Sequence, residues 1–236
     1  TGLDKYPDTR PTDIAILKFM SNFKNEFNLD MTIRLPFGHF ISPTALIIQD
    51  KFYTEINSRD NYDFYDAMAK LNAFIKVKLR HKIICGHNIN NFDLKQANVW
   101  LNKALYDPYP FQEKYGHVII DTISVAKFVK AFDENFNFPN FKLETIMKFF
   151  LGDSYKQAHG AAADVKDVFN FLQMADKKLR LFKDKSLIEI LQWYSSKINR
   201  NSIFDYSLVF RPSNKGKFEP IIPLSNNTKW KNHKII

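Results

Sequence analysis

The chain has 236 residues, of which 45% are hydrophobic, and its mean hydropathy is −0.33, values typical of a globular protein with a substantial core. Because no run of about 18 apolar residues is present, we expect no membrane span. The chain carries 34 Lys and Arg against 25 Asp and Glu, and its net charge of +9 at pH 7 favours a polyanionic partner such as a nucleic acid.

The first third of the chain predicts an antiparallel hairpin followed by helices. Apolar residues alternate with polar ones over 12–20 and 26–35, which predicts two strands joined by a turn at 21–25. Helical spacing of apolar residues then predicts a helix over 62–80, with Asn61 or Asp60 as its N-cap.

Strands and helices then alternate. We expect a buried strand at 83–86, a helix over 93–105, a strand over 117–121 and a helix after it. Cys85 is the single cysteine, which excludes an internal disulfide and fits a reducing compartment such as the cytoplasm. Its place in an apolar strand predicts a packed thiol. The alternation as a whole predicts an α/β fold in which helices flank a mixed sheet.

Two polar stretches precede helices. In the first, Asn88 and Asn91 lie between a predicted strand and Asp93, which begins a helix. In the second, His159 is followed by a glycine, three alanines and Asp164, at the start of a long amphipathic helix. Taken alone, this second stretch is also explained by an ordinary helix start with a solvent-facing acid, because short motifs misfire readily.

Together, the two stretches resemble the second and third motifs of the DEDDh 3′–5′ exonucleases, a family with the ribonuclease-H-like fold. Residues 90–93, Asn-Asn-Phe-Asp with Asn88 just upstream, resemble the Asn-x-x-Phe-Asp that ends the second motif with a different spacing, and His159 with Asp164 matches the His-x4-Asp of the third. The order and separation of the motifs also fit. An Asp at the position of Asp121 is usually structural in this family.

The first family motif, Asp-x-Glu, is followed by Thr-Gly-Leu, and this chain begins with Thr1, Gly2 and Leu3. We therefore expect the Asp-x-Glu pair and the central strand that carries it to lie upstream of Thr1. If the pair is absent there, the protein is a defective relative. Residues 36–46 resemble the family's segment ahead of a short helix near the terminal base of the substrate. The usual Gly-Ile-Thr that follows is absent, and residues 49–51 stand roughly in its place, so the contacts to the terminal base differ from the family pattern.

Within the family, the segments around the third motif resemble the bacterial exonuclease I branch. By this resemblance, residues 1–183 form the exonuclease domain. Residues 184–236 form a connecting helix, over 184–197, and the start of a small SH3-like β domain with strands at 207–210 and 218–224.

The resemblance implies a metal-dependent 3′–5′ exonuclease that releases nucleoside 5′-monophosphates from single-stranded DNA with two Mg²⁺ or Mn²⁺ ions. Carboxylates suit such ions, and an imidazole with a pKa near 6.5 suits a general base. The roles it implies are metal binding and catalysis for Asp93 and Asp164, catalysis as general base for His159, and substrate binding for Thr1, Gly2, Leu3, Asn88 and Asn91.

Single-stranded DNA is favoured over RNA as the partner, and replication or repair proteins are further candidates. Two alternatives stay open. One is an exoribonuclease or oligoribonuclease of the same fold, since the sugar contact depends on the shape of the site. The other is a nucleic-acid-binding module that has lost catalysis, although binding alone requires neither Asp93, His159 nor Asp164.

Overall fold

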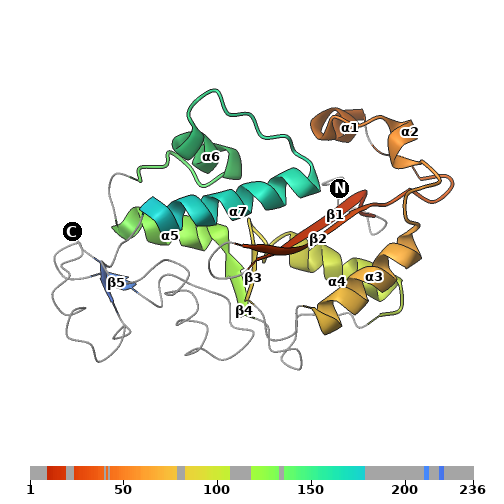
Figure 1. Ribbon diagram of the computed structural model, residues 1–236, viewed down its shortest axis with the longest axis horizontal. Coiled ribbons are helices and arrows are strands. Elements are labelled where there is room, and N and C mark those ends of the chain that lie inside the picture. Colours follow the sequence, from red (N-terminus) through yellow and green to blue (C-terminus); the bar gives the residue numbers. More distant parts are fainter. Residues whose placement is uncertain are drawn as a thin grey trace.

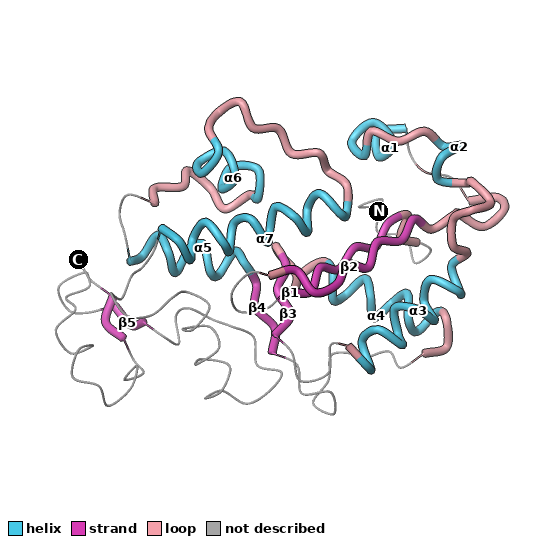
Figure 2. Tube along the Cα trace, viewed as in Figure 1, coloured by secondary structure: helices cyan, strands magenta, loops and turns pink. Residues whose placement is uncertain are grey.

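The computed structural model describes residues 10–19, 24–39, 41, 43–78, 83–106, 118–132, 136–178, 210–212 and 218–220. The elements in chain order are β1 (Asp13–Phe19), β2 (Asn25–Thr32), α1 (Pro43–Gln49), α2 (Tyr53–Ile56), α3 (Phe64–Val77), β3 (Ile83–Gly86), α4 (Asp93–Lys103), β4 (Val118–Asp121), α5 (Thr122–Phe132), α6 (Leu143–Leu151), α7 (Ala161–Lys178), β5 (Phe210–Pro212) and β6 (Phe218–Pro220). Figure 1 shows their arrangement, and Figure 2 shows the helices and strands along the chain.

The strands β1 and β2 form the predicted antiparallel hairpin. Ile14 pairs with Met31 and Ile16 pairs with Leu29, and the register shifts between Lys18 and Phe19. Because side chains alternate across a strand, residues 14 and 16 point to one face of β1 while Phe19 points to the other. The alternation read from the sequence therefore corresponds to a hairpin with covered faces.

The helices α3 and α4 cover one face of this hairpin. In Figure 1, α7 lies on the opposite side of the hairpin. The buried cluster between them consists of Met31, Ile33, Phe64, Ala67, Met68, Leu71, Phe74, Ile75, Trp100, Leu101 and Ala104. Burying this much apolar surface is the main force that holds the hairpin to the helices.

The predicted start of α3 needs correction. Neither Asn61 nor Asp60 caps the helix: its N-cap is Asp63, whose Oδ1 accepts a hydrogen bond from the backbone N–H of Asp66 at 2.9 Å. The Asn61 amide instead donates to the backbone oxygens of Glu55, at 2.7 Å, and of Ile56, at 2.9 Å, and so satisfies acceptors at the end of α2. The helix spans Phe64–Val77, within the predicted 62–80.

The helix α7 packs against β1, β3 and α6. The ring of Phe169 on α7 meets that of Phe19 on β1 edge to face, with ring centroids 4.9 Å apart. Further along, Phe150 of α6 packs against Phe171 of α7 with centroids 6.0 Å apart. These contacts fix the direction of α7, and with it the place of the residues in its first turn.

The strands β3 and β4 run parallel, with Ile84 opposite Ile119 and Gly86 opposite Asp121. This confirms both predicted strands. Parallel pairing brings the segments after both carboxyl ends to the same edge, namely the loop at 87–92 and the start of α5. The described strands pair as β1–β2, β3–β4 and β5–β6, so the single mixed sheet that was predicted is not present among the residues that the structure describes.

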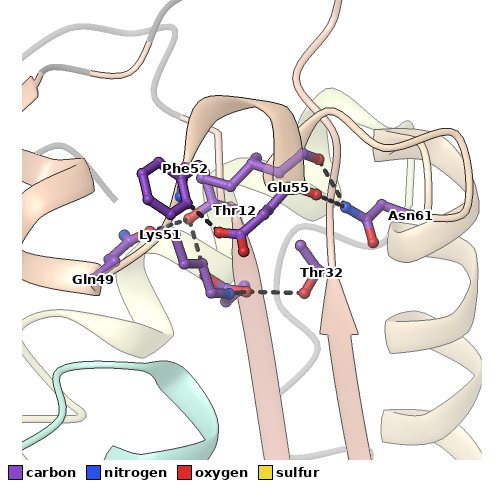
Figure 3. A network of polar contacts seen from close by, with 9 residues as sticks. Thr12, Thr32, Gln49, Lys51, Phe52, Glu55 and Asn61 are labelled. Carbon is purple, nitrogen blue, oxygen red and sulfur yellow. Dashed lines mark hydrogen bonds and ion pairs between the residues drawn. The ribbon is translucent and has the colours of Figure 1, made fainter.

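A polar network attaches the end of α1 to the hairpin (Figure 3). The Lys51 ammonium lies 2.5 Å from Oδ1 of Asp13, which also accepts a hydrogen bond from the Thr32 hydroxyl at 3.2 Å. The Thr12 hydroxyl donates to Oε1 of Gln49 at 3.3 Å. Residues 49 and 51, which replace the family's usual Gly-Ile-Thr, therefore bind the hairpin.

Near the C-terminus, β5 and β6 form a short antiparallel pair, where strands at 207–210 and 218–224 were predicted. The helix predicted over 184–197 lies outside the described residues, and the SH3-like domain stays a prediction. None of the helices in the described ranges is both long enough and apolar enough to cross a membrane.

Candidate functional site

The site is built from two segments that enter helices, one before α7 and one before α4. Asp164 stands in the first turn of α7 and is half-buried. Its backbone N–H donates to the oxygen of Gly160 at 2.8 Å, and its Oδ1 accepts a hydrogen bond from the Gln157 amide at 2.6 Å. His159, just before the helix, is exposed and has a φ of 51°. The left-handed region is uncommon for any residue other than glycine.

Asp164 and His159 interact electrostatically. Desolvation by the surrounding protein raises the pKa of Asp164, while the Gln157 hydrogen bond and the charge of His159 lower it. The charge of Asp167, one turn further along α7, raises the same pKa. The charge of His159 thus favours the charged form of the Asp164 carboxylate, and the charge of Asp167 disfavours it. A nearby cation would offset the effect of Asp167.

Asp93 begins α4 after a loop that is held by its own polar groups. The backbone N–H groups of Asn91 and Phe92 donate to the oxygen of Asn88 at 3.1 and 3.0 Å, and the Asn91 amide donates to Oδ1 of Asn88 at 3.1 Å. Asn88 itself has a φ of 58°. The loop is therefore compact, and it places Asp93 at the start of the helix.

Burial among protein atoms raises the pKa of Asp93 to about 6, and the charges of Asp121 and Asp164 also raise it, while its own backbone N–H lowers it. The residue is nevertheless exposed to solvent, so protein surrounds its carboxyl group on most sides but leaves it accessible. The charge of Asp164 on α7 is thus felt by Asp93 on α4, after the larger effects of burial and of Asp121. Carboxylate oxygens are hard ligands that suit a divalent cation.

Asp121 stabilises the loop at 87–92. It is only 6% exposed, and its Oδ1 accepts hydrogen bonds from the backbone N–H groups of Asn88, at 3.0 Å, and Ile123, at 2.9 Å. This is the structural role that the sequence suggested. Next to it, Nδ1 of His87 lies 3.1 Å from the hydroxyl of Thr122. Desolvation lowers the pKa of His87, and the charge of Asp121 opposes that effect.

The loop also requires a glycine at its start. A Cβ at Gly86 would lie 2.8 Å from Cδ1 and 2.9 Å from Cβ of Ile89, which is buried. The close approach of Gly86 and Ile89 lets the chain turn directly from β3 into the Asp93 loop. The position therefore excludes any larger side chain without a shift of the loop.

Among the residues of the predicted site, Asp93 begins α4, Asp164 lies in the first turn of α7, and His159 lies just before α7. The charge of Asp164 contributes to the pKa of Asp93, and the charge of His159 contributes to the pKa of Asp164. Asn88 and Asn91 lie in the loop before Asp93. Thr1, Gly2 and Leu3 lie outside the described residues. Within the described ranges, no group of three or more His, Cys, Asp or Glu side chains is arranged to hold a metal ion.

Three residues of the site were missed by sequence reasoning: Gln157, Tyr155 and Asp167. Gln157 binds Asp164 as described, and the Tyr155 hydroxyl donates to Oδ2 of Asp167. Asp167 was detectable in principle, because it lies three residues after Asp164 and shares its helix face. The sequence carries no comparable signal for Tyr155 and Gln157, because loop residues have no fixed spacing to their partners.

No protein-family model matches the chain, and no curated protein matches it in sequence. Solved structures do match it. E. coli exonuclease I in complex with a dT13 oligonucleotide has a TM-score of 0.63 and 20% identity, over 76% of this chain and 40% of that one. A zinc-bound E. coli ExoI–ssDNA complex has a TM-score of 0.64 and 21% identity over the same shares.

A third match, an ExoI/SSB-Ct complex, has a TM-score of 0.60 and 17% identity over 75% of this chain and 40% of that one. This chain spans about 40% of the length of the structures that it matches. At this level of identity the likeness concerns the fold. The predicted resemblance is thus confirmed at the level of the fold, which this chain shares with exonuclease I over three quarters of its length.

Proposed function

We propose that the protein is a metal-dependent 3′–5′ exonuclease that acts on single-stranded DNA. The observation that carries this proposal is that the charge of Asp164 on α7 acts on Asp93 on α4, and the charge of His159 acts on Asp164. The fold that this chain shares with exonuclease I supports the proposal, because solved structures of that enzyme contain single-stranded oligonucleotides.

The donor chemistry supports a divalent cation. Asp93 and Asp164 offer hard oxygen atoms, and burial and then the charges of Asp121 and Asp164 raise the pKa of Asp93, so a bound divalent ion would stabilise the charged form of this carboxylate. When bound, Mg²⁺ or Mn²⁺ would supply charge stabilisation at the attacked phosphate and the leaving oxygen. The Gln157 amide holds one oxygen of Asp164 and orients this carboxylate.

His159 is proposed to accept the proton of the attacking water. The residue is exposed, so water reaches it, and its charge lowers the pKa of Asp164. Histidine is the side chain that most often acts as a general base. Asn88 and Asn91 are proposed to contact the substrate. They carry amide groups on the loop that ends at Asp93.

The positive charge of the chain supports a single-stranded nucleic acid as the substrate, because 34 basic residues against 25 acidic ones attract phosphates. DNA is proposed over RNA because the matched complexes contain DNA oligonucleotides. The match to an ExoI/SSB-Ct complex supports a further proposal, that a protein of DNA replication or repair binds this chain.

The test is digestion of a 5′-labelled single-stranded DNA by the full-length protein, with Mg²⁺ and with a chelator. We expect a ladder that shortens from the 3′ end and requires the metal. Asp164→Ala should abolish the ladder, whereas Asp60→Ala, a change at an exposed acid outside the site, should leave it intact. An RNA strand of the same sequence tests the sugar preference.

Salt-sensitive binding of the strand without cleavage in any metal would overturn the catalytic proposal and indicate a binding module. Faster cleavage of RNA than of DNA would indicate an exoribonuclease. A ladder that shortens from the 5′ end, read with a 3′ label, would contradict the polarity.

A further inference from the structure

The loop between α6 and α7 turns two of its side chains toward the protein. The helix α6 ends at Leu151, and Gly152 follows with a φ of 95°. Of the residues from 151 to 159, all are exposed except Tyr155 and Gln157, which are half-buried. The loop is therefore attached to the rest of the molecule mainly by these two side chains.

Both side chains bind acids on the same face of α7. The Tyr155 hydroxyl donates to Oδ2 of Asp167, and the Gln157 amide donates to Oδ1 of Asp164 at 2.6 Å. Asp167 is only 8% exposed, and a buried carboxylate is costly unless a donor satisfies it. The burial of Asp167 therefore favours retention of the tyrosine contact, one helical turn from Asp164.

His159 follows these two anchors directly, four residues after Tyr155 and two after Gln157. Its φ of 51° lies in the left-handed region, which is uncommon for residues other than glycine, although His is among those that adopt it more often. On the other side of His159, α7 begins at Ala161. The imidazole is thus carried by a short segment that is fixed on one side by Tyr155 and Gln157 and on the other by the helix.

We propose that the hydrogen bond between Tyr155 and Asp167 is a positioning latch, which holds the His159 segment over the first turn of α7 and so keeps the imidazole beside Asp164. This inference rests on the proposed function, in which His159 is the general base. Tyr155 and Asp167 are positioning residues in it and act through His159. Gln157 is the second anchor, but its contact with Asp164 would also affect the metal site, so the tyrosine gives the cleaner test.

The first experiment measures kcat and KM of the full-length protein on single-stranded DNA with Mg²⁺. Tyr155→Phe keeps the ring and removes only the hydroxyl group. Because a small misplacement of a catalytic group costs up to about 100-fold in rate, we expect kcat to fall roughly 10- to 100-fold with little change in KM. Asp167→Asn should retain most of the activity, since its amide still forms a hydrogen bond with the hydroxyl group. Tyr65→Phe, at an exposed tyrosine of α3, is the matched control.

A general loss of structure is separated from positioning by the His159→Ala background. A residue that acts only through His159 should have no further effect once His159 is gone, so the double variant should cleave at the same residual rate as His159→Ala alone. If Tyr155→Phe lowers the rate equally in both backgrounds, the role is merely structural and the latch proposal is wrong. Unchanged kcat in the single variant would also overturn it.

A second measurement does not depend on activity. In protein labelled with ¹⁵N at its six histidines, the imidazole signals of His159 are assigned by their loss in His159→Gln. Tyr155→Phe should shift or broaden these signals, and Tyr65→Phe should not. Shifted signals in a protein that cleaves no DNA would support the latch and overturn the nuclease function. Unshifted signals in a protein that cleaves DNA would overturn the latch and leave the nuclease function supported.

Discussion

The carboxyl groups of Asp93 and Asp164 belong to different helices, α4 and α7, yet the charge of Asp164 contributes to the raised pKa of Asp93. Desolvation makes the larger contribution and Asp121 adds to it, which together bring the pKa to about 6. Burial and like charge both disfavour the charged form of Asp93 in the metal-free protein. In the proposed function, a bound divalent ion would offset both effects.

The first prediction concerns the metal-free protein. The pKa of Asp93 rises from 3.8 to about 6 on folding, so its protonated form contributes stability below about pH 4, and this contribution is lost as the pH rises through about 6. With a chelator present, the Tm of the wild type should therefore decrease between about pH 4 and pH 7 by more than the Tm of Asp93→Asn does. Asp164→Asn should reduce the fall, because it removes one repelling charge.

Thermal unfolding followed by circular dichroism measures this difference. Added Mg²⁺ should raise the wild-type Tm at about pH 7 and have little effect on Asp93→Asn. Parallel pH profiles for wild type and Asp93→Asn would contradict the assignment.

The second prediction concerns Gly86. An alanine there would place its Cβ 2.8 to 2.9 Å from atoms of Ile89, one of which is the branched Cβ and cannot swing away. We expect Gly86→Ala to lower the free energy of unfolding by about 1–3 kcal/mol, the usual cost of overpacking. It should also lower nuclease activity, because the shifted loop carries Asp93.

Denaturant unfolding gives the free energy. Gly160→Ala is the matched control, since its Cβ would meet nothing within 4 Å, and it should change stability by no more than about 0.5 kcal/mol. Equal stabilities for the two variants would show that the loop absorbs the extra methyl group.

The strands and helices of this chain were predictable to the extent that periodicity fixes them. The alternation in 12–20 and 26–35 gave the hairpin, and the motif around Asp93 gave the turn from β3 into α4. The N-cap of α3 was not predictable from the sequence, because Asp60, Asn61 and Asp63 are all good N-cap residues. The choice depends on the tertiary structure, in which Asn61 donates to the end of α2 and Asp63 caps α3.

Contacts between distant residues were also beyond the sequence. The pair of Tyr155 and Asp167 spans 12 positions and that of Asp13 and Lys51 spans 38, and no local pattern connects them. For the same reason the predicted site of Asp93, His159 and Asp164 rested on the family resemblance, because neither composition nor spacing relates Asp93 to Asp164.

The third prediction concerns the pair of Lys51 and Asp13. Their side chains are 27% and 10% exposed, and Asp13 also accepts a hydrogen bond from Thr32. Lys51→Met would leave this mostly buried carboxylate without its cation, which should lower the free energy of unfolding by about 1–3 kcal/mol. The comparison is Lys148→Met, which breaks an i,i+4 pair with Glu144 whose side chains are 38% and 39% exposed.

Surface pairs of that kind contribute about 0.3–0.5 kcal/mol, so Lys148→Met should be nearly neutral. Urea unfolding of both variants at low and high salt measures the contrast. If Lys51→Met is as mild as Lys148→Met, the network of Figure 3 does not stabilise the attachment of α1 to the hairpin.

The last prediction concerns Cys85. Burial raises the pKa of its thiol from 9.0 to about 12. Since the thiolate is the reactive form, the native thiol should react slowly with a disulfide reagent at about pH 8 and quickly in guanidinium chloride. The raised pKa also predicts that stability, relative to Cys85→Ala, is retained below about pH 9 and lost as the pH rises toward 12. Absorbance of the released thiol gives the reaction rate, and fast stoichiometric labelling of the native protein would show instead that the segment around β3 opens readily in solution.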